Sequence, residues 1–188
     1  MPSERQLRDW IQEHGLVLRR SRYTLGAAEV GLPHLDEPPQ QPLPGFGAML
    51  AQDGVPYKVD LVGWQHDHKA DGVVLAELKI GPAQPSHVLQ IVSYMNYLRW
   101  MLRHLPQPNL EVLAKRIGYP RLQPNTPVTG LLVAAEFDYD LWWSVPPLRG
   151  TKLILVRHDI DKETRGKADG IKHVRFLDFT RKMREHWR

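Results

Sequence analysis

A short apolar run with two charges inside it constrains this chain more than any other feature. Residues 73–80 read Val-Val-Leu-Ala-Glu-Leu-Lys-Ile, a composition and length that predict a strand. Because side chains alternate along a strand, Glu77 and Lys79 share one face with Val73 and Leu75. A carboxylate and an ammonium are costly to bury unless they are paired or hold a metal. The run therefore predicts a strand whose charges serve chemistry.

A second acidic residue precedes this run on a neighbouring predicted strand. Asp60 lies within Val59-Asp60-Leu61-Val62, and a polar, hairpin-like stretch separates it from Glu77. Two carboxylates on adjacent strands, with the backbone carbonyl of Leu78, form the kind of oxygen-ligand set that Mg²⁺ prefers. Lys79 would lie beside the ion. There it could orient or help deprotonate an attacking water, or offset negative charge on a phosphodiester.

A strongly periodic segment follows and predicts a helix from Ser86 to about Leu105, with Pro85 and Ser86 as start signals. Its apolar stripe consists of residues at helical spacing: Val88, Ile91, Val92, Met95, Leu98, Leu102 and Leu105. Gln90 and Tyr94 lie four residues apart on an adjoining face, so their side chains can reach the same point.

The spacing Asp60-x(16)-Glu77-x-Lys79 resembles the PD-(D/E)XK nuclease superfamily, and the following Gln90-x-x-x-Tyr94 resembles its NucS-like and RecB-like members. Val59 stands where the family shorthand has Pro, a common departure. The resemblance implies an α/β fold with a restriction-endonuclease-like core (αβββαβ), in which helices flank a mixed sheet. It also implies a Mg²⁺- or Mn²⁺-dependent deoxyribonuclease whose five motif residues are catalytic, with the Gln and Tyr touching the active-site edge or a substrate phosphate.

Two upstream elements extend this resemblance. Residues 5–14 predict a helix, and Glu29, within a predicted strand at 27–30, becomes a candidate third metal ligand or a group supporting the ligands. An exposed strand position explains Glu29 equally well. Glu4 and Glu13 are less attractive as site residues, because acids in a first helical turn favour the helix dipole and a surface Glu needs no special reason.

The rest of the chain suggests further strands and one long loop. Apolar runs at 128–135, 141–145 and 152–156 predict strands, and the order helix, strands, helix, strand suits an α/β sandwich. Residues 31–53 are rich in Pro and Gly and predict a loop that borders the site.

Composition predicts one domain spanning residues 1–188. The chain is 42% hydrophobic and 24% charged, enough for one sizeable core. No apolar stretch reaches the roughly 20 residues that cross a bilayer. The absence of cysteine and of an apolar leader favours the cytoplasm.

The net charge of +4 is concentrated in a basic C-terminal segment at 157–188, where ten Lys and Arg residues face six Asp and Glu residues. Such a segment would attract a phosphate backbone without reading base sequence. Nucleic acid is therefore the predicted partner. The family resemblance implies that this nucleic acid is DNA and suggests a homodimer. The alternative is a non-catalytic nucleic-acid- or protein-binding module that retains the fold. The intact Asp60, Glu77 and Lys79 argue against it, because a binding module gains nothing from carboxylates facing a polyanion.

Overall fold

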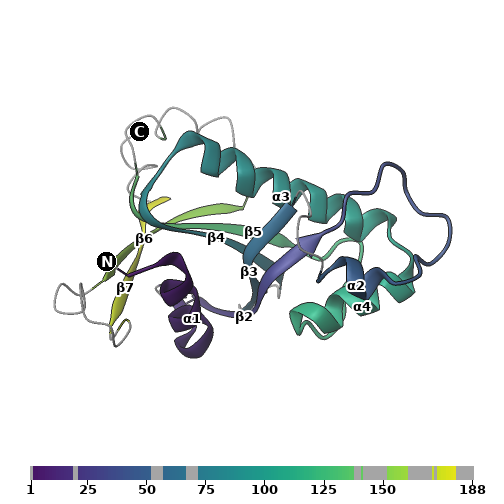
Figure 1. The fold of residues 1–188 in the computed structure, drawn as a ribbon, viewed down its shortest axis with the longest axis horizontal. Helices are drawn as coiled ribbons and strands as arrows, with labels where there is room; N and C mark the ends of the chain where they lie inside the picture. The colour runs from purple at the N-terminus through teal and green to yellow at the C-terminus, as the bar shows by residue number, and fades with distance from the viewer. Residues whose placement is uncertain are drawn as a thin grey trace.

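Helices cover both faces of one mixed sheet in this computed structural model (Figure 1). The structure describes residues 2–18, 21–51, 57–66, 72–137, 141, 152–160, 171 and 173–180. The helices in this part are α1 (Glu4–His14), α2 (Phe46–Met49), α3 (Pro85–His104) and α4 (Gln107–Ile117). The strands are β1 (Leu16–Leu18), β2 (Ser21–Leu32), β3 (Tyr57–His66), β4 (Gly72–Ala83), β5 (Val128–Phe137), β6 (Leu153–Ile160) and β7 (Val174–Asp178). The α/β class predicted from the sequence is confirmed.

The strands lie side by side in chain order, from β1 to β7. The pairs from β1 to β4 are antiparallel, β4–β5 and β5–β6 are parallel, and β6–β7 is antiparallel. Helices α3 and α4 make the long crossover that the parallel pair β4–β5 requires. Residues of the two edge strands, β1 and β7, approach each other, so the sheet is strongly curled.

Two apolar cores lie on opposite faces of the sheet. The α3-side core joins α2, α3 and α4 to the sheet and includes Val73 and Leu75 of β4. The α1-side core joins α1 to strands from both edges and includes Val74 and Ala76. The predicted alternation of β4 is therefore confirmed, and the strand is buried on both faces.

Helix α1 is fixed at its start and along its inner face. Ser3 and Gln6 form a capping box, in which each side chain bonds the backbone N–H of the other residue. Leu7 and Ile11 are fully buried against the sheet. The ring of Trp10 contacts Phe176 of β7. These contacts hold the helix across the face around which the sheet curls.

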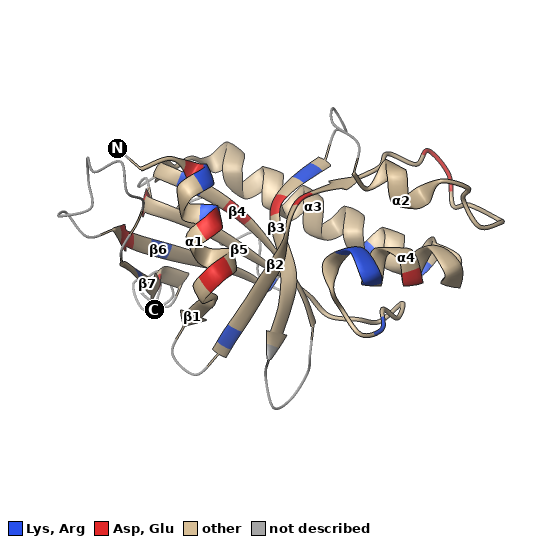
Figure 2. Ribbon diagram, turned by 60° about the horizontal axis from the view of Figure 1, so that its bottom comes forward, with Lys and Arg blue, Asp and Glu red and all other residues tan. Residues whose placement is uncertain are grey.

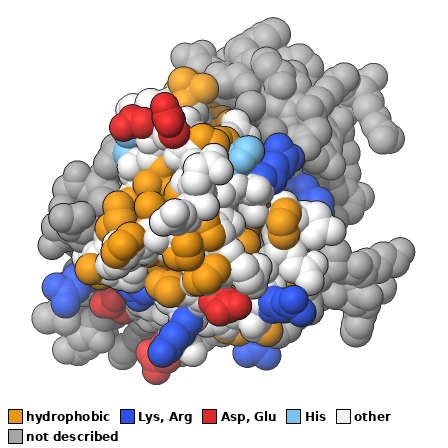
Figure 3. Space-filling model, turned by 90° about the vertical axis from the view of Figure 1, so that its right-hand side faces the viewer, with side chains coloured by type: hydrophobic (Ala, Val, Ile, Leu, Met, Phe, Trp, Pro, Cys, Tyr) orange, Lys and Arg blue, Asp and Glu red, His pale blue; other side chains and the backbone are white. Residues whose placement is uncertain are grey.

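The predicted loop at 31–53 is shorter than expected, because β2 continues through Leu32 and α2 interrupts the loop. Tyr97 of α3 anchors its beginning: the Tyr97 hydroxyl donates to the Pro33 carbonyl and accepts from the Leu35 N–H. Buried Asn109 of α4 bonds both the N–H and the carbonyl of Leu43. The end of the molecule carrying α2 and α4 exposes many hydrophobic side chains, with charged ones around them (Figure 3).

The predicted strands at 128–135 and 152–156 correspond to β5 and β6. Of the segment predicted as a strand at 141–145, only buried Leu141 belongs to the described residues. Most of the basic C-terminal segment, namely residues 161–170, 172 and 181–188, lies outside them. No helix in the described part of the chain is long and apolar enough to cross a membrane.

Gly63 of β3 offers a test of how closely β2 and β3 are packed. A Cβ at this position would collide with the carbonyl oxygen of Thr24 and lie 2.7 Å from the Cα of Leu25. We expect Gly63→Ala to lower the free energy of unfolding by about 3 kcal/mol, because backbone atoms cannot move aside cheaply. The matched control is Gly26→Ala, whose Cβ would meet nothing within 4 Å. Urea unfolding of both variants measures the difference, and equal stabilities would contradict the prediction.

Candidate active site

The predicted site residues meet where β3 and β4 separate. The β3–β4 ladder ends at the pair Leu61–Ala76, although β3 stays paired with β2 and β4 with β5 beyond that point. In the gap, Asp60 Oδ2 accepts a hydrogen bond of 2.7 Å from the backbone N–H of Leu78. The carboxylate thus satisfies an N–H group at the place where the neighbouring strand has left.

Asp60 lies at a break in strand alternation. Val59 packs in the α3-side core and Leu61 in the α1-side core, although two residues apart should share a face. The β2–β3 register places Glu29 opposite Asp60, and Glu29 has a φ of 52° in the left-handed region. Regular alternation therefore does not fix the direction of either carboxylate, and the gap is accessible to groups from both faces of the sheet.

Glu77 is the most deeply buried charged residue of the site, with only 2% of its surface exposed. Its Oε1 lies 3.0 Å from the Lys79 ammonium. Its Oε2 is buried and has no hydrogen-bond partner among the described residues. Leaving a buried carboxylate oxygen unsatisfied is costly, so this atom is suited to bind a cation.

The three motif residues, Asp60, Glu77 and Lys79, shift one another's pKa values. Burial and the nearby charge of Asp60 raise the pKa of Glu77 to about 7. Burial also raises the pKa of Asp60, although the Leu78 hydrogen bond and the charge of Lys79 oppose the shift. Burial lowers the pKa of Lys79, but Glu77, Glu4 and Asp60 outweigh it and the net shift is upward. Lys79 is accordingly an ammonium at neutral pH.

The predicted helix pair also meets beside this cluster. Gln90 Nε2 donates a hydrogen bond of 2.6 Å to the hydroxyl of Tyr94, which is buried. Burial raises the pKa of Tyr94, and the charges of Glu77 and Asp60 raise it further. Tyr94 therefore lies on the α3 side, near enough to both carboxylates for their charges to act on its hydroxyl.

On the other side, α1 and the strands enclose an open pocket of about 560 Å³, lined by Glu4, Arg5, Arg8, Glu29, Asp60 and Leu78. Figure 2 shows charged positions of α1 alongside those of the strands beneath it. Glu4 Oε1 lies 3.9 Å from the Lys79 ammonium, so a residue that sequence reasoning set aside belongs to the site. The spacing of residues 4, 5 and 8 along one helix face was visible in the sequence. The sequence did not show which strand this helix face covers.

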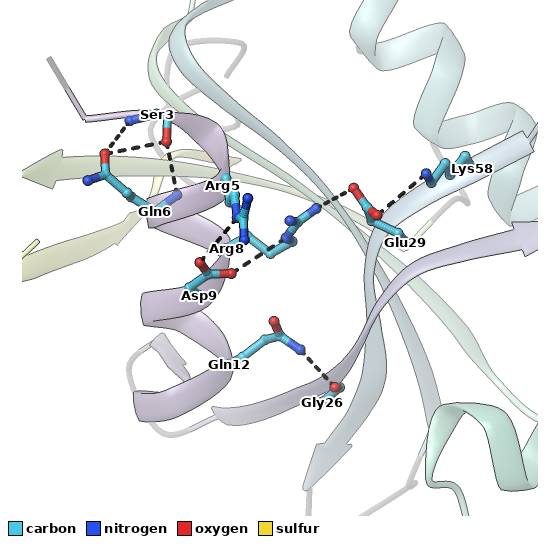
Figure 4. A network of polar contacts seen from close by, with 9 residues as sticks. All are labelled: Ser3, Arg5, Gln6, Arg8, Asp9, Gln12, Gly26, Glu29 and Lys58. Atoms are coloured by element: carbon cyan, nitrogen blue, oxygen red, sulfur yellow. Dashed lines mark hydrogen bonds and ion pairs between the residues drawn. The ribbon is translucent and has the colours of Figure 1, made fainter. Parts of the chain in front are cut away.

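Glu29 lines the same pocket but is held by cations. Its Oε1 lies 2.7 Å from Arg8 Nη1 and its Oε2 lies 3.5 Å from the Lys58 ammonium (Figure 4). The hydrogen bond and charge of Arg8 lower the pKa of Glu29, although its side chain is half exposed. The metal-ligand role of Glu29 stays a prediction, and its contacts in this structure are with Arg8 and Lys58.

The backbone contributes to the site at two points. The N–H and C=O of one strand residue point the same way, so the Leu78 carbonyl faces the gap as its N–H does. His158 of β6 donates from Nε2 to the Lys79 carbonyl over 2.9 Å and fixes the backbone of the lysine. No group of three His, Cys, Asp or Glu side chains in the described ranges is placed to hold a metal. An ion here would therefore rest on Asp60, Glu77 and the Leu78 carbonyl.

Comparisons with known proteins identify no relative. No protein-family model matches the chain, and no curated protein or solved structure matches it either.

The pKa of Glu77 can be tested through stability. Because this pKa rises from 4.5 to about 7 on folding, the folded protein holds a proton that the unfolded chain releases between these pH values. The parent should therefore lose stability relative to Glu77→Gln as pH rises from 5 to 8, by roughly 3 kcal/mol in EDTA.

Urea unfolding of the parent and the variant at pH 5, 6, 7 and 8 measures this difference. In the parent, the ion pair between Glu77 and Lys79 exists only when Glu77 is ionised, so its contribution to stability is already included in the raised pKa of Glu77. Exposed Glu111 of α4 supplies the control variant Glu111→Gln, which should parallel the parent. A stability difference between parent and Glu77→Gln that stays constant from pH 5 to 8 would refute the raised pKa.

Proposed function

We propose that this protein is a metal-dependent nuclease that hydrolyses phosphodiester bonds in DNA. The observation that carries the proposal is the Glu77 carboxylate: one oxygen contacts Lys79, and the other is buried without a hydrogen-bond partner among the described residues. Asp60 raises the cost of ionising it. A divalent cation between the two carboxylates would remove both penalties.

The donor set fits Mg²⁺ or Mn²⁺. Asp60, Glu77 and the Leu78 carbonyl are hard oxygen ligands, and a site with few protein ligands leaves positions for water and phosphate, as Mg²⁺ sites commonly do. When bound, the ion supplies Lewis-acid stabilisation of the phosphodiester.

The remaining motif residues, Lys79, Gln90 and Tyr94, position the water and the substrate. The Lys79 ammonium can hold an attacking water by donating a hydrogen bond, and its charge offsets the negative charge that develops on the phosphate. Its position depends on Glu77, on Glu4 and on the His158 hydrogen bond to its carbonyl. Gln90 and Tyr94, bonded to each other, form a polar contact for a substrate phosphate on the α3 side.

The order of elements supports a restriction-endonuclease-like core. The elements α1, β2, β3, β4, α3 and β5 follow the αβββαβ order that the motif resemblance implies. The motif residues fall on β3, β4 and α3, as the resemblance requires. The choice of DNA over RNA rests on the same resemblance, since most of that family cuts DNA.

Cleavage should require a divalent ion and Lys79. We expect the protein to cut DNA in Mg²⁺ or Mn²⁺ and not in EDTA, in a panel of single-stranded, duplex, mismatched and branched substrates. Lys79→Ala should lower the rate by about 100-fold, the lower end of what a positioned proton-transfer group contributes. Lys115→Ala, at an exposed position of α4, is the control and should cut at the parental rate. A protein that binds DNA but cuts none of the panel with either ion would overturn the nuclease proposal.

Metal binding should depend on Asp60. Calorimetric titration with Mn²⁺ is expected to show at least a tenfold weaker affinity for Asp60→Asn than for the parent, because the variant loses a charged oxygen ligand. Asp159→Asn, at an exposed position of β6, is the matched control. Equal Mn²⁺ affinities of Asp60→Asn and the parent would remove Asp60 from the metal site.

A further inference from the structure

We propose that Arg5 and Arg8 of α1 form an anion-binding subsite that takes a phosphate group of the nucleic acid beside the metal site. The proposal rests on the nuclease function and deepens it by adding a second point of substrate contact. Both arginines line the pocket of about 560 Å³ that also exposes Asp60 and Leu78. A phosphate held there would lie in the same cavity as the reacting group.

Arg8 has binding capacity that the protein does not use. A guanidinium carries five N–H donors in a fixed fork that matches a phosphate. Nη1 donates to Glu29 over 2.7 Å, whereas Nε is buried and makes no hydrogen bond to any described residue. The Arg8 side chain is only 17% exposed, so its orientation is largely fixed before a ligand arrives.

Arg5 supplies the second charge, one turn earlier on the same helix face. Its side chain is 80% exposed and its Nε lies 3.9 Å from Asp9 Oδ2. Asp9 Oδ1 lies 3.8 Å from Arg8 Nε, so one carboxylate lies beside both arginines (Figure 4). The exposed ion pair between Arg5 and Asp9 contributes little free energy. A phosphate could therefore replace Asp9 as the partner of Arg5 without large loss.

The subsite is organised in advance by contacts on both sides of it. Buried Leu7 and Ile11 fix α1, and Gln12 Nε2 donates to the Gly26 carbonyl of β2 over 2.9 Å. Glu29 holds Arg8 from the opposite wall of the pocket. The left-handed backbone of Glu29 is strained for a residue with a side chain, and such strain persists only where the surroundings impose it.

The local charge explains why this subsite should act together with the metal. Five carboxylates surround the pocket and the motif cluster: Glu4, Asp9, Glu29, Asp60 and Glu77. Four cations face them: Arg5, Arg8, Lys58 and Lys79. A divalent cation would turn this slight negative excess into a positive one. Phosphate affinity should therefore rise when the ion binds.

The test is oligonucleotide binding by fluorescence anisotropy, in Ca²⁺ and in EDTA. Ca²⁺ is chosen because it also takes oxygen ligands. Three versions of one strand are compared, carrying a 5′-phosphate, a 3′-phosphate or no terminal phosphate. In Ca²⁺ we expect Arg8→Gln to weaken binding about tenfold and Arg5→Gln about threefold, as expected for lost charge-assisted hydrogen bonds. Arg8→Lys should not restore binding, because an ammonium lacks the planar fork. Arg103→Gln, at an exposed position of α3, is the control and should bind like the parent.

The arms identify which phosphate is bound. A loss confined to one terminally phosphorylated strand assigns the subsite to that end, and an equal loss on all three strands assigns it to an internal phosphodiester. Either result supports the subsite. Parental binding by both Arg8→Gln and Arg5→Gln in Ca²⁺ would overturn it. Because Arg5 is exposed, its variant keeps the test decisive even if urea unfolding shows that Arg8→Gln is unstable.

Failure of the subsite and failure of the nuclease proposal are distinguishable. If the parent cuts DNA in Mg²⁺ and both variants bind like the parent, the subsite is wrong and the nuclease stands. If the parent cuts nothing but Arg8→Gln still loses Ca²⁺-dependent binding, the subsite stands without the nuclease.

Discussion

The hydrogen bond from the Leu78 N–H to the Asp60 carboxylate is the interaction on which the candidate site depends. A strand that leaves its neighbour exposes N–H and C=O groups that must find other partners. Here Asp60 of β3 supplies the partner for the Leu78 N–H of β4. The two strands can therefore separate after the pair Leu61–Ala76 without leaving this N–H unsatisfied. The resulting gap is what brings groups from both faces of a continuous sheet to one place.

Burying the Glu77 carboxylate in this gap destabilises the folded protein. Glu77 is buried beside a second carboxylate, and only one of its oxygens has a cation near it. Sites that bind a charged ligand are commonly less stable without it, because the same groups that favour the bound state repel one another when it is absent. Lys79 compensates part of this cost through Glu77 and Glu4, and so links the two sides of the gap.

Local periodicity in the sequence predicted much of the fold, but it predicted only part of the candidate site. The helical stripe after Ser86 and the alternation of Val73 to Lys79 predicted α3 and β4, because both patterns depend on short-range geometry. The break at Asp60 and Glu29 was not predictable, since no Gly or Pro marks it and a left-handed Glu has no sequence signature. The place of α1 was hidden for another reason: Leu7 and Ile11 indicate a buried face, but not the strand beneath it. Glu4, Arg5 and Arg8 entered the site only through that docking.

The two sides of the gap carry different polar groups, and this asymmetry bears on how a strand would lie. On the α3 side, Gln90 and Tyr94 offer neutral hydrogen-bonding groups beside the carboxylates. On the α1 side, Arg5 and Arg8 offer fixed positive charge around the shared pocket. Once a divalent ion has offset the carboxylates of the gap, a phosphate backbone would be attracted more strongly to the arginine side, because counterion release favours it there. A nucleic acid crossing the gap would thus be held in one direction, with its more tightly bound phosphate over α1. The fold alone would not fix this direction, because the direction depends on the particular side chains that the gap brings together.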